Sequence, residues 1–358
     1  MGNIAVLFFR KELKFHRFFK FQFIWTFAEF IVSIIAVFVL RNVWALAAGL
    51  MAGAFTKCIV SYIVEPYRPR LRFIRSQAKE LFRFGKWVLG SSILIFFITQ
   101  GDDLFVGSIL GATMLGFYQM AYRISNISTA EINHIIVEVS FPLYSKMQDD
   151  LNRMRKTYLS IFQVVTFISF PIAGLIIVLV PGFTRIFLGE QWLPVIPVIQ
   201  LIAISGLLGS IITLCIPLFR ALGRPGVETA WQIVRAIIIL ASIYPLTVKY
   251  GIIGTSFSLI FGALFSGIGF CVQAVKILKC GVWAFLKILI IPLTGTLIMV
   301  LALYLLRTYL VTGEILSFVL LLSTAAGLFV FMVYLADRFL GYGIKLLFKK
   351  WIGSFIKG

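Results

Sequence analysis

The chain has 358 residues, of which 60% are apolar, 15% aromatic and only 13% charged, and its formal net charge is +19. This apolar content exceeds what the core of a water-soluble protein requires, so we expect most of the chain to lie in lipid. The Lys and Arg residues stand between apolar runs and not along one basic face, which argues against nucleic acid as a partner.

Ten apolar segments are long enough to cross a membrane, which takes about 20 residues of helix. They lie at 21–40, 43–64, 87–108, 112–134, 157–180, 195–219, 229–248, 251–275, 283–306 and 315–337. The sequence therefore predicts an all-α fold, a polytopic membrane helical bundle of about ten transmembrane helices.

The basic residues are unevenly shared between the two sides of the membrane. When the connections are assigned alternately to two sides, the basic residues on one of them are Arg41, Arg185, Lys249 and Arg307, and nearly all the others fall on the opposite side. Because cytoplasmic loops carry the excess of Lys and Arg, we expect both termini to be cytoplasmic.

Two further segments have an amphipathic pattern with a basic face. Residues 65–86 predict a cytoplasmic linker helix between two lobes, and residues 341–358 predict a cytoplasmic tail that lies on the membrane surface. Residues 21–64 and 229–275 also share one plan, in which a polar break precedes a helix rich in small residues. This weak repeat indicates a duplicated transporter architecture, although small residues also enrich at any interface between membrane helices.

Several ordered motifs carry a resemblance to a known family. They are FGKWVLGSSILIFFITQGDDLFVGSILGATMLGFYQMAYRI (84–124), FPLYSKMQDD (141–150), FLGEQW (187–192) and ALGRPG (221–226). In their order and spacing the chain resembles the Wzx-type oligosaccharide and polysaccharide flippases of the multidrug/oligosaccharidyl-lipid/polysaccharide exporter superfamily. Members of that family have fourteen helices in two lobes plus an extra pair, so the resemblance implies a partial two-lobed exporter fold that lacks about four N-terminal helices.

The resemblance also implies a division of the chain. Residues 1–64 would be a two-span remnant of the N-terminal lobe, 87–277 a six-helix C-terminal lobe and 278–340 the extra helix pair, with the linker at 65–86 and the tail at 341–358.

By the same resemblance, the expected function is translocation of an oligosaccharide on polyprenyl pyrophosphate across the bacterial cytoplasmic (inner) membrane by alternating access. The expected partners are this lipid-linked oligosaccharide, membrane lipids and other membrane proteins of polysaccharide assembly. We expect no cofactor, no metal and no enzymatic activity. The alternatives are a cation-coupled small-molecule exporter of the same superfamily and a membrane-embedded glycan polymerase or ligase, for which the short outer connections leave little room for a catalytic loop.

Charged residues inside apolar spans are the candidate site residues, because an ionised side chain at mid-membrane costs about 2.5 to 3.5 kcal/mol on insertion scales. Glu29 and Lys57 lie at mid-span in neighbouring helices, where an ion pair is conceivable, and Arg123 follows in the fourth span. We predict these three as residues of a substrate cavity, since arginine in particular suits phosphate. Arg235 is a weaker candidate, because its side chain is within snorkelling reach of the cytoplasm.

Acidic residues and one histidine are the candidates for proton coupling. Asp102 and Asp103 lie near the outer end of the third span, either as a titrating pair or simply solvated at the membrane surface. Glu131, His134 and Glu138 fall three and four residues apart and so share one helical face. That face predicts either a proton relay or a polar stripe at the cytoplasmic mouth.

Overall fold

The computed structural model describes residues 3, 6, 8, 9, 12, 15–42, 44–64, 74–309 and 315–340. The chain folds into two compact units, and each is described by itself. Unit 1 contains residues 1–81 and 138–143, and unit 2 contains residues 82–137 and 144–358. The predicted tail at 341–358 lies outside the described residues.

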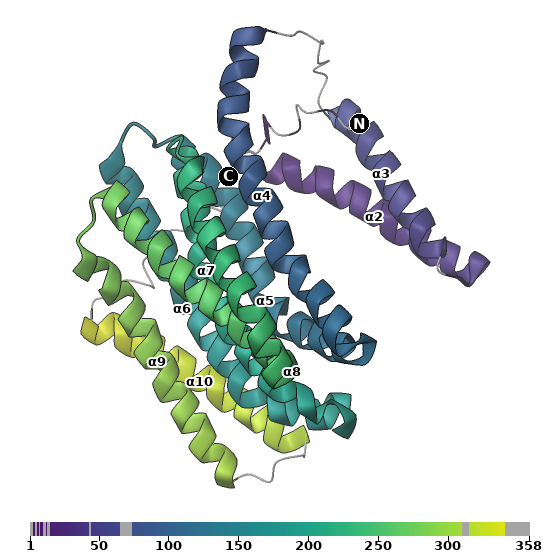
Figure 1. The fold of residues 1–358 in the computed structure, drawn as a ribbon, viewed down its shortest axis with the longest axis vertical. Coiled ribbons are helices and arrows are strands. Elements are labelled where there is room, and N and C mark those ends of the chain that lie inside the picture. Colours follow the sequence, from purple (N-terminus) through teal and green to yellow (C-terminus); the bar gives the residue numbers. More distant parts are fainter. Residues whose placement is uncertain are drawn as a thin grey trace. The chain divides into compact units, whose positions relative to one another are not determined.

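In unit 1, α2 (Phe15–Leu40) and α3 (Trp44–Val64) form an antiparallel hairpin (Figure 1). The chain turns at Arg41, which has a positive φ of 47°, and the Asn42 side chain accepts a hydrogen bond from the backbone N–H of Trp44 at 3.0 Å. Glycines let the two helices approach closely, because a Cβ at Gly53 would lie 2.9 Å from the Cβ of Glu29. The predicted spans 21–40 and 43–64 are thus two packed helices.

Unit 2 is a bundle of long helices. They are α4 (Arg75–Leu110), which begins in unit 1, α5 (Ala112–Ser145), whose residues 138–143 belong to unit 1, α6 (Leu151–Phe183), α7 (Ile196–Ala221), α8 (Pro225–Leu278), α9 (Val282–Tyr309) and α10 (Ile315–Leu340). Helix α6 packs against α7, α9 and α10, while α7 packs along α8 (Figure 1). Apolar side chains of α4 to α8 form a common core around Val106, Tyr118 and Ile199.

Short breaks separate the helices of unit 2 where the apolar runs are interrupted. Gly111, with a φ of 85°, ends α4, and a π-helical turn (Thr184–Leu188) and a 3-10 helix (Glu190–Val195) join α6 to α7 around Gly189. Helix α8 folds back on itself at Gly251, whose φ of 60° and ψ of −142° favour glycine, and the Leu246 carbonyl lies against Gly254. The predicted spans 229–248 and 251–275 are therefore the two arms of α8.

Seven helices of the described chain are long and apolar enough to cross a membrane. Helix α8, with 54 residues, counts once among them although it has two arms. Helix α5, predicted as a span at 112–134, is not among the seven, and α10 contributes a shorter apolar stretch at Ser317–Phe329. The prediction of an all-α, polytopic membrane bundle with about ten helices is confirmed.

The predicted linker helix differs from the structure in one respect. Residues 75–86 are not a separate surface helix but the first turns of α4, which runs without interruption to Leu110. The basic side chains here lead directly into the apolar span, and the helix continues through Gly85 without a turn. Residues 65–73 lie outside the described part of the chain.

Candidate functional site

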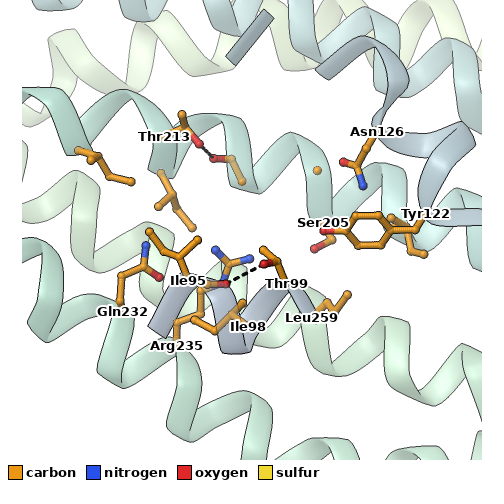
Figure 2. Close-up of a pocket in the computed structure, with 15 residues that line it drawn as sticks. Ile95, Ile98, Thr99, Tyr122, Asn126, Ser205, Thr213, Gln232, Arg235 and Leu259 are labelled. Atoms are coloured by element: carbon orange, nitrogen blue, oxygen red, sulfur yellow. Dashed lines mark hydrogen bonds between the residues drawn. The ribbon is translucent and has the colours of Figure 1, made fainter. Parts of the chain in front are cut away.

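A cavity of about 220 Å³ lies inside unit 2, where α4, α5, α7 and α8 meet (Figure 2). Its polar lining residues are Thr99, Tyr122, Asn126, Ser205, Thr213, Gln232 and Arg235. Isoleucines of α4 and α7 and Leu259 of α8 complete its wall. The site is therefore a polar pocket inside an apolar bundle.

Helical spacing explains why these side chains converge. Residues three, four or seven positions apart share one face of a helix. On α8 this relation holds for Gln232 and Arg235, on α5 for Tyr122 and Asn126, and on α7 for Ser205, which is followed by Gly209 and Ile212. The Thr229 hydroxyl also donates a 2.8 Å hydrogen bond to the Trp87 carbonyl, which fixes the first arm of α8 against α4.

Arg235 is the charged residue of the lining, and its guanidinium points into the cavity (Figure 2). Its Nε is shielded from solvent and has no hydrogen-bond partner among the described residues. Gln232, one helical turn earlier, is 1% exposed, and its Oε1 likewise has no partner there. Buried polar groups in folded proteins are nearly always hydrogen-bonded, so two unpaired ones on a single helix face indicate a site that takes a ligand or water.

A buried carboxylate lies one helical turn from the cavity wall. Asp102, four residues after Ile98, is 3% exposed. The Tyr118 hydroxyl donates to Asp102 Oδ2 at 2.7 Å, and the Asp103 backbone N–H donates to Asp102 Oδ1 at 3.0 Å. Asp103 is half-buried and accepts a 3.2 Å hydrogen bond from the Gln119 side chain.

No hydrogen bond or ion pair joins Asp102 to Arg235 in the described structure. The carboxylate oxygens of Asp102 accept from Tyr118 and from the Asp103 backbone, and the N–H groups of Arg235 are not used by this carboxylate.

The other predicted cavity residues lie outside this pocket. Arg123 is exposed, although it directly follows the lining residue Tyr122. In unit 1, Lys57 is exposed and its Nζ lies 5.0 Å from the centre of the Trp25 ring. Glu29 is half-buried against Gly53, and within the described hairpin no ion pair joins it to Lys57.

Of the predicted polar face on α5, Glu138 is half-buried, and the side chains of Glu131 and His134 lie outside the described residues. From the sequence, Arg235 is a weaker candidate than Arg123, and Gln232 is not predicted as a site residue. The sequence does contain a pattern that indicates both residues. Gln232 and Arg235 are polar, lie three positions apart and so share one face of the largely apolar first arm of α8.

A model of the polysaccharide biosynthesis protein family matches residues 1–197, more than half of the chain. The chain belongs to this family. It is 30% identical over 208 residues to the lipopolysaccharide biosynthesis protein WzxC of Escherichia coli, a match that covers 56% of this chain and 42% of WzxC. It is 27% identical over 226 residues to the teichuronic acid biosynthesis protein TuaB of Bacillus subtilis, covering 62% of this chain and 47% of TuaB.

A longer match extends beyond the region of the family model. An uncharacterized membrane protein in the cps region of Klebsiella pneumoniae is 24% identical over 349 residues, which are 95% of this chain and 71% of that protein. This chain thus spans less than half of WzxC and TuaB but most of the Klebsiella protein.

Among solved structures, the lipid II flippase MurJ in an inward closed conformation superimposes with a TM-score of 0.66 at 14% identity, covering 88% of this chain and 67% of MurJ. The fold is therefore MurJ-like. These matches confirm the family resemblance drawn from the motifs, and with the candidate spans they identify a multi-pass membrane protein of a bacterial polysaccharide biosynthesis family.

Proposed function

We propose that this protein moves an oligosaccharide linked to polyprenyl pyrophosphate across the bacterial cytoplasmic membrane by alternating access, during polysaccharide export. The observation that carries this proposal is the polar cavity around Arg235 inside the bundle of unit 2. Sugar hydroxyls and phosphate cannot cross hydrocarbon unaided, because each unpaired polar group costs several kcal/mol there. A polar compartment between membrane helices lowers that cost and requires no covalent chemistry.

The names of relatives support the same function. Similar proteins include the succinoglycan biosynthesis transport protein ExoT of Rhizobium meliloti and a putative O-antigen transporter of Shigella flexneri. In this proposal Lys57, Arg123 and Glu29 remain candidates for contact with the substrate, and Arg235 joins them. Asp102, Asp103, Glu131, His134 and Glu138 remain candidates for proton coupling, and both termini are cytoplasmic.

A cation-coupled small-molecule exporter is the weaker alternative. Such a protein would attract its cationic substrate with acidic side chains, whereas the charged residue that lines this cavity is an arginine. A glycan polymerase or ligase is also less favoured, because the connection from α6 to α7 forms compact π and 3-10 turns with one acidic residue, Glu190.

Flipping of a fluorescent oligosaccharide on polyprenyl pyrophosphate, by the purified chain in liposomes, tests the proposal. We expect the protein to expose the labelled sugar to an external quencher faster than liposomes without protein do. Arg235→Gln should slow this exposure, while Arg185→Gln, which changes an exposed arginine outside the cavity, should not. Equal rates with and without the wild-type protein would refute the proposed function.

A further inference from the structure

We propose that the cavity around Arg235 and Gln232 binds one sugar unit that carries a carboxylate, as a hexuronate does, and so selects acidic oligosaccharides. This inference rests on the proposed function and adds to it the chemical class of sugar that the bundle of unit 2 recognises. It depends on the donors, acceptors, apolar walls and volume of the cavity.

The donors for a carboxylate come from Arg235. A guanidinium carries five N–H groups in a planar fork that matches the two oxygens of a carboxylate. None of these groups donates to a described residue, and Nε is fully shielded from solvent. Asp102 accepts from Tyr118 and from the Asp103 backbone and not from Arg235, so the fork is available for an oxyanion in the cavity.

The acceptors for sugar hydroxyls come from three other residues of the lining. Thr99 donates its hydroxyl proton to the Ile95 carbonyl at 2.9 Å, and Thr213 donates to the Gly209 carbonyl at 2.8 Å (Figure 2). Each threonine oxygen therefore remains free to accept, and Gln232 Oε1 is a further buried acceptor that has no partner in the described structure. A ligand rich in hydroxyl donors would satisfy all three.

The walls and the volume favour a single ring. The lining alternates these polar groups with Ile98, Ile202, Ile212 and Leu259, which can pack against the C–H faces of a pyranose. A volume of about 220 Å³ corresponds to about seven water molecules at roughly 30 Å³ each, which suits one monosaccharide better than two.

The charge balance favours one carboxylate over a phosphate. Arg235 is the charged residue of the lining, and the carboxylate of Asp102 accepts hydrogen bonds from Tyr118 and from the Asp103 backbone, not from Arg235. A ligand with one negative charge can pair with this single guanidinium. A phosphate monoester with nearly two charges would leave part of its charge uncompensated in a desolvated site.

Titrations of the full chain in detergent, followed by saturation-transfer NMR of the sugar protons, test this inference. The probes are glucuronate and glucose, with inorganic phosphate added as a competitor of glucuronate. We expect glucuronate to bind more tightly than glucose, and phosphate to compete only weakly. Arg235→Gln should weaken glucuronate binding by about tenfold or more, because it removes a charge-assisted pair of hydrogen bonds.

Two further variants keep the experiment decisive. Arg185→Gln makes the same chemical change at an exposed position outside the cavity and should bind glucuronate as the wild type does. If Arg235→Gln does not fold, Gln232→Leu replaces it, and this change should weaken both sugars because it removes an acceptor for hydroxyls.

The inference is overturned if glucuronate does not bind, if glucose binds equally well, or if phosphate competes as strongly as a second portion of glucuronate. Failure of the proposed function gives a different pattern, in which glucuronate binds in the cavity but the wild-type protein does not flip lipid-linked sugar. Normal flipping without glucuronate binding would refute the inference and leave the proposed function intact.

Discussion

The hairpin of unit 1 and the bundle of unit 2 both contain ionisable residues in apolar helices, but they surround these residues differently. In the most apolar stretches of α2 and α3, 6% and 17% of the residues are buried, whereas the value for α6 in unit 2 is 67%. Glu29 and Lys57 are accordingly half-buried and exposed. In unit 2, Asp102 is 3% exposed although the most apolar stretch of its own helix, α4, is only 17% buried, and Tyr118 of α5 donates a hydrogen bond to it. An embedded charge becomes part of a defined site only where enough helices surround it.

Substitutions in the two units can test this difference. The largest expected effect on the free energy of unfolding comes from Glu228, at the start of α8. Its carboxylate is fully buried and forms a bidentate ion pair with Arg220, with N···O distances of 2.7 and 2.8 Å. Glu228→Ala should lower the free energy of unfolding by about 3 kcal/mol, because it leaves a partly buried guanidinium without its partner. Thermal unfolding in detergent measures this loss.

Glu29→Ala is the matched change in unit 1. It should shift the unfolding free energy by less than about 0.5 kcal/mol, because Glu29 has no ion pair to Lys57 in the described hairpin. Equal losses for the two variants would contradict the distinction between the units.

The second prediction concerns the buried carboxylate of Asp102. Tyr118→Phe removes the 2.7 Å hydrogen bond to Asp102 Oδ2 and should destabilise the protein by about 2 kcal/mol, because a buried carboxylate oxygen loses its donor. Tyr122→Phe is the control, since no described residue accepts a hydrogen bond from its hydroxyl, and it should be nearly neutral. A Tyr122 variant as unstable as the Tyr118 variant would show that the cavity wall, and not the carboxylate, controls stability.

Effects smaller than those of Glu228→Ala and Tyr118→Phe come from one glycine substitution made in each unit. Gly49→Ala in α3 should destabilise the hairpin by about 1 kcal/mol, because the new Cβ would lie 2.9 Å from the Cβ of Ser33 and would push α2 away. Gly209→Ala in α7 should instead stabilise the bundle by up to about 1 kcal/mol, because its Cβ would enter open space and alanine favours helix.

Hydrogen–deuterium exchange of the backbone amides, followed by mass spectrometry, separates these two effects. We expect faster exchange in α2 and α3 for the first variant and slower exchange in α7 for the second. Changes of the same sign in both would mean that helix propensity alone decides the outcome.

The sequence predicted the helices of this protein well. Apolar runs end where Arg41 and Asn42, Gly111, or Lys249 to Gly251 interrupt them, and the structure turns at each of these places. The sequence ranked Arg123 above Arg235 as a candidate, and of these two arginines it is Arg235 that lines the pocket of unit 2. The sequence of one helix shows which of its residues are charged and at what depth in the membrane they lie. It does not show which neighbouring helix each face contacts.

The order and the approximate number of the helices were therefore determined by the sequence alone, because lipid requires each span to satisfy its own backbone hydrogen bonds over about 20 apolar residues. The cavity was decided only by tertiary structure. Arg235 faces it and Arg123 does not, and Tyr118 reaches Asp102, because α4, α5, α7 and α8 meet at particular faces. Those faces are selected by close packing between helices, and no single segment of the chain contains that information.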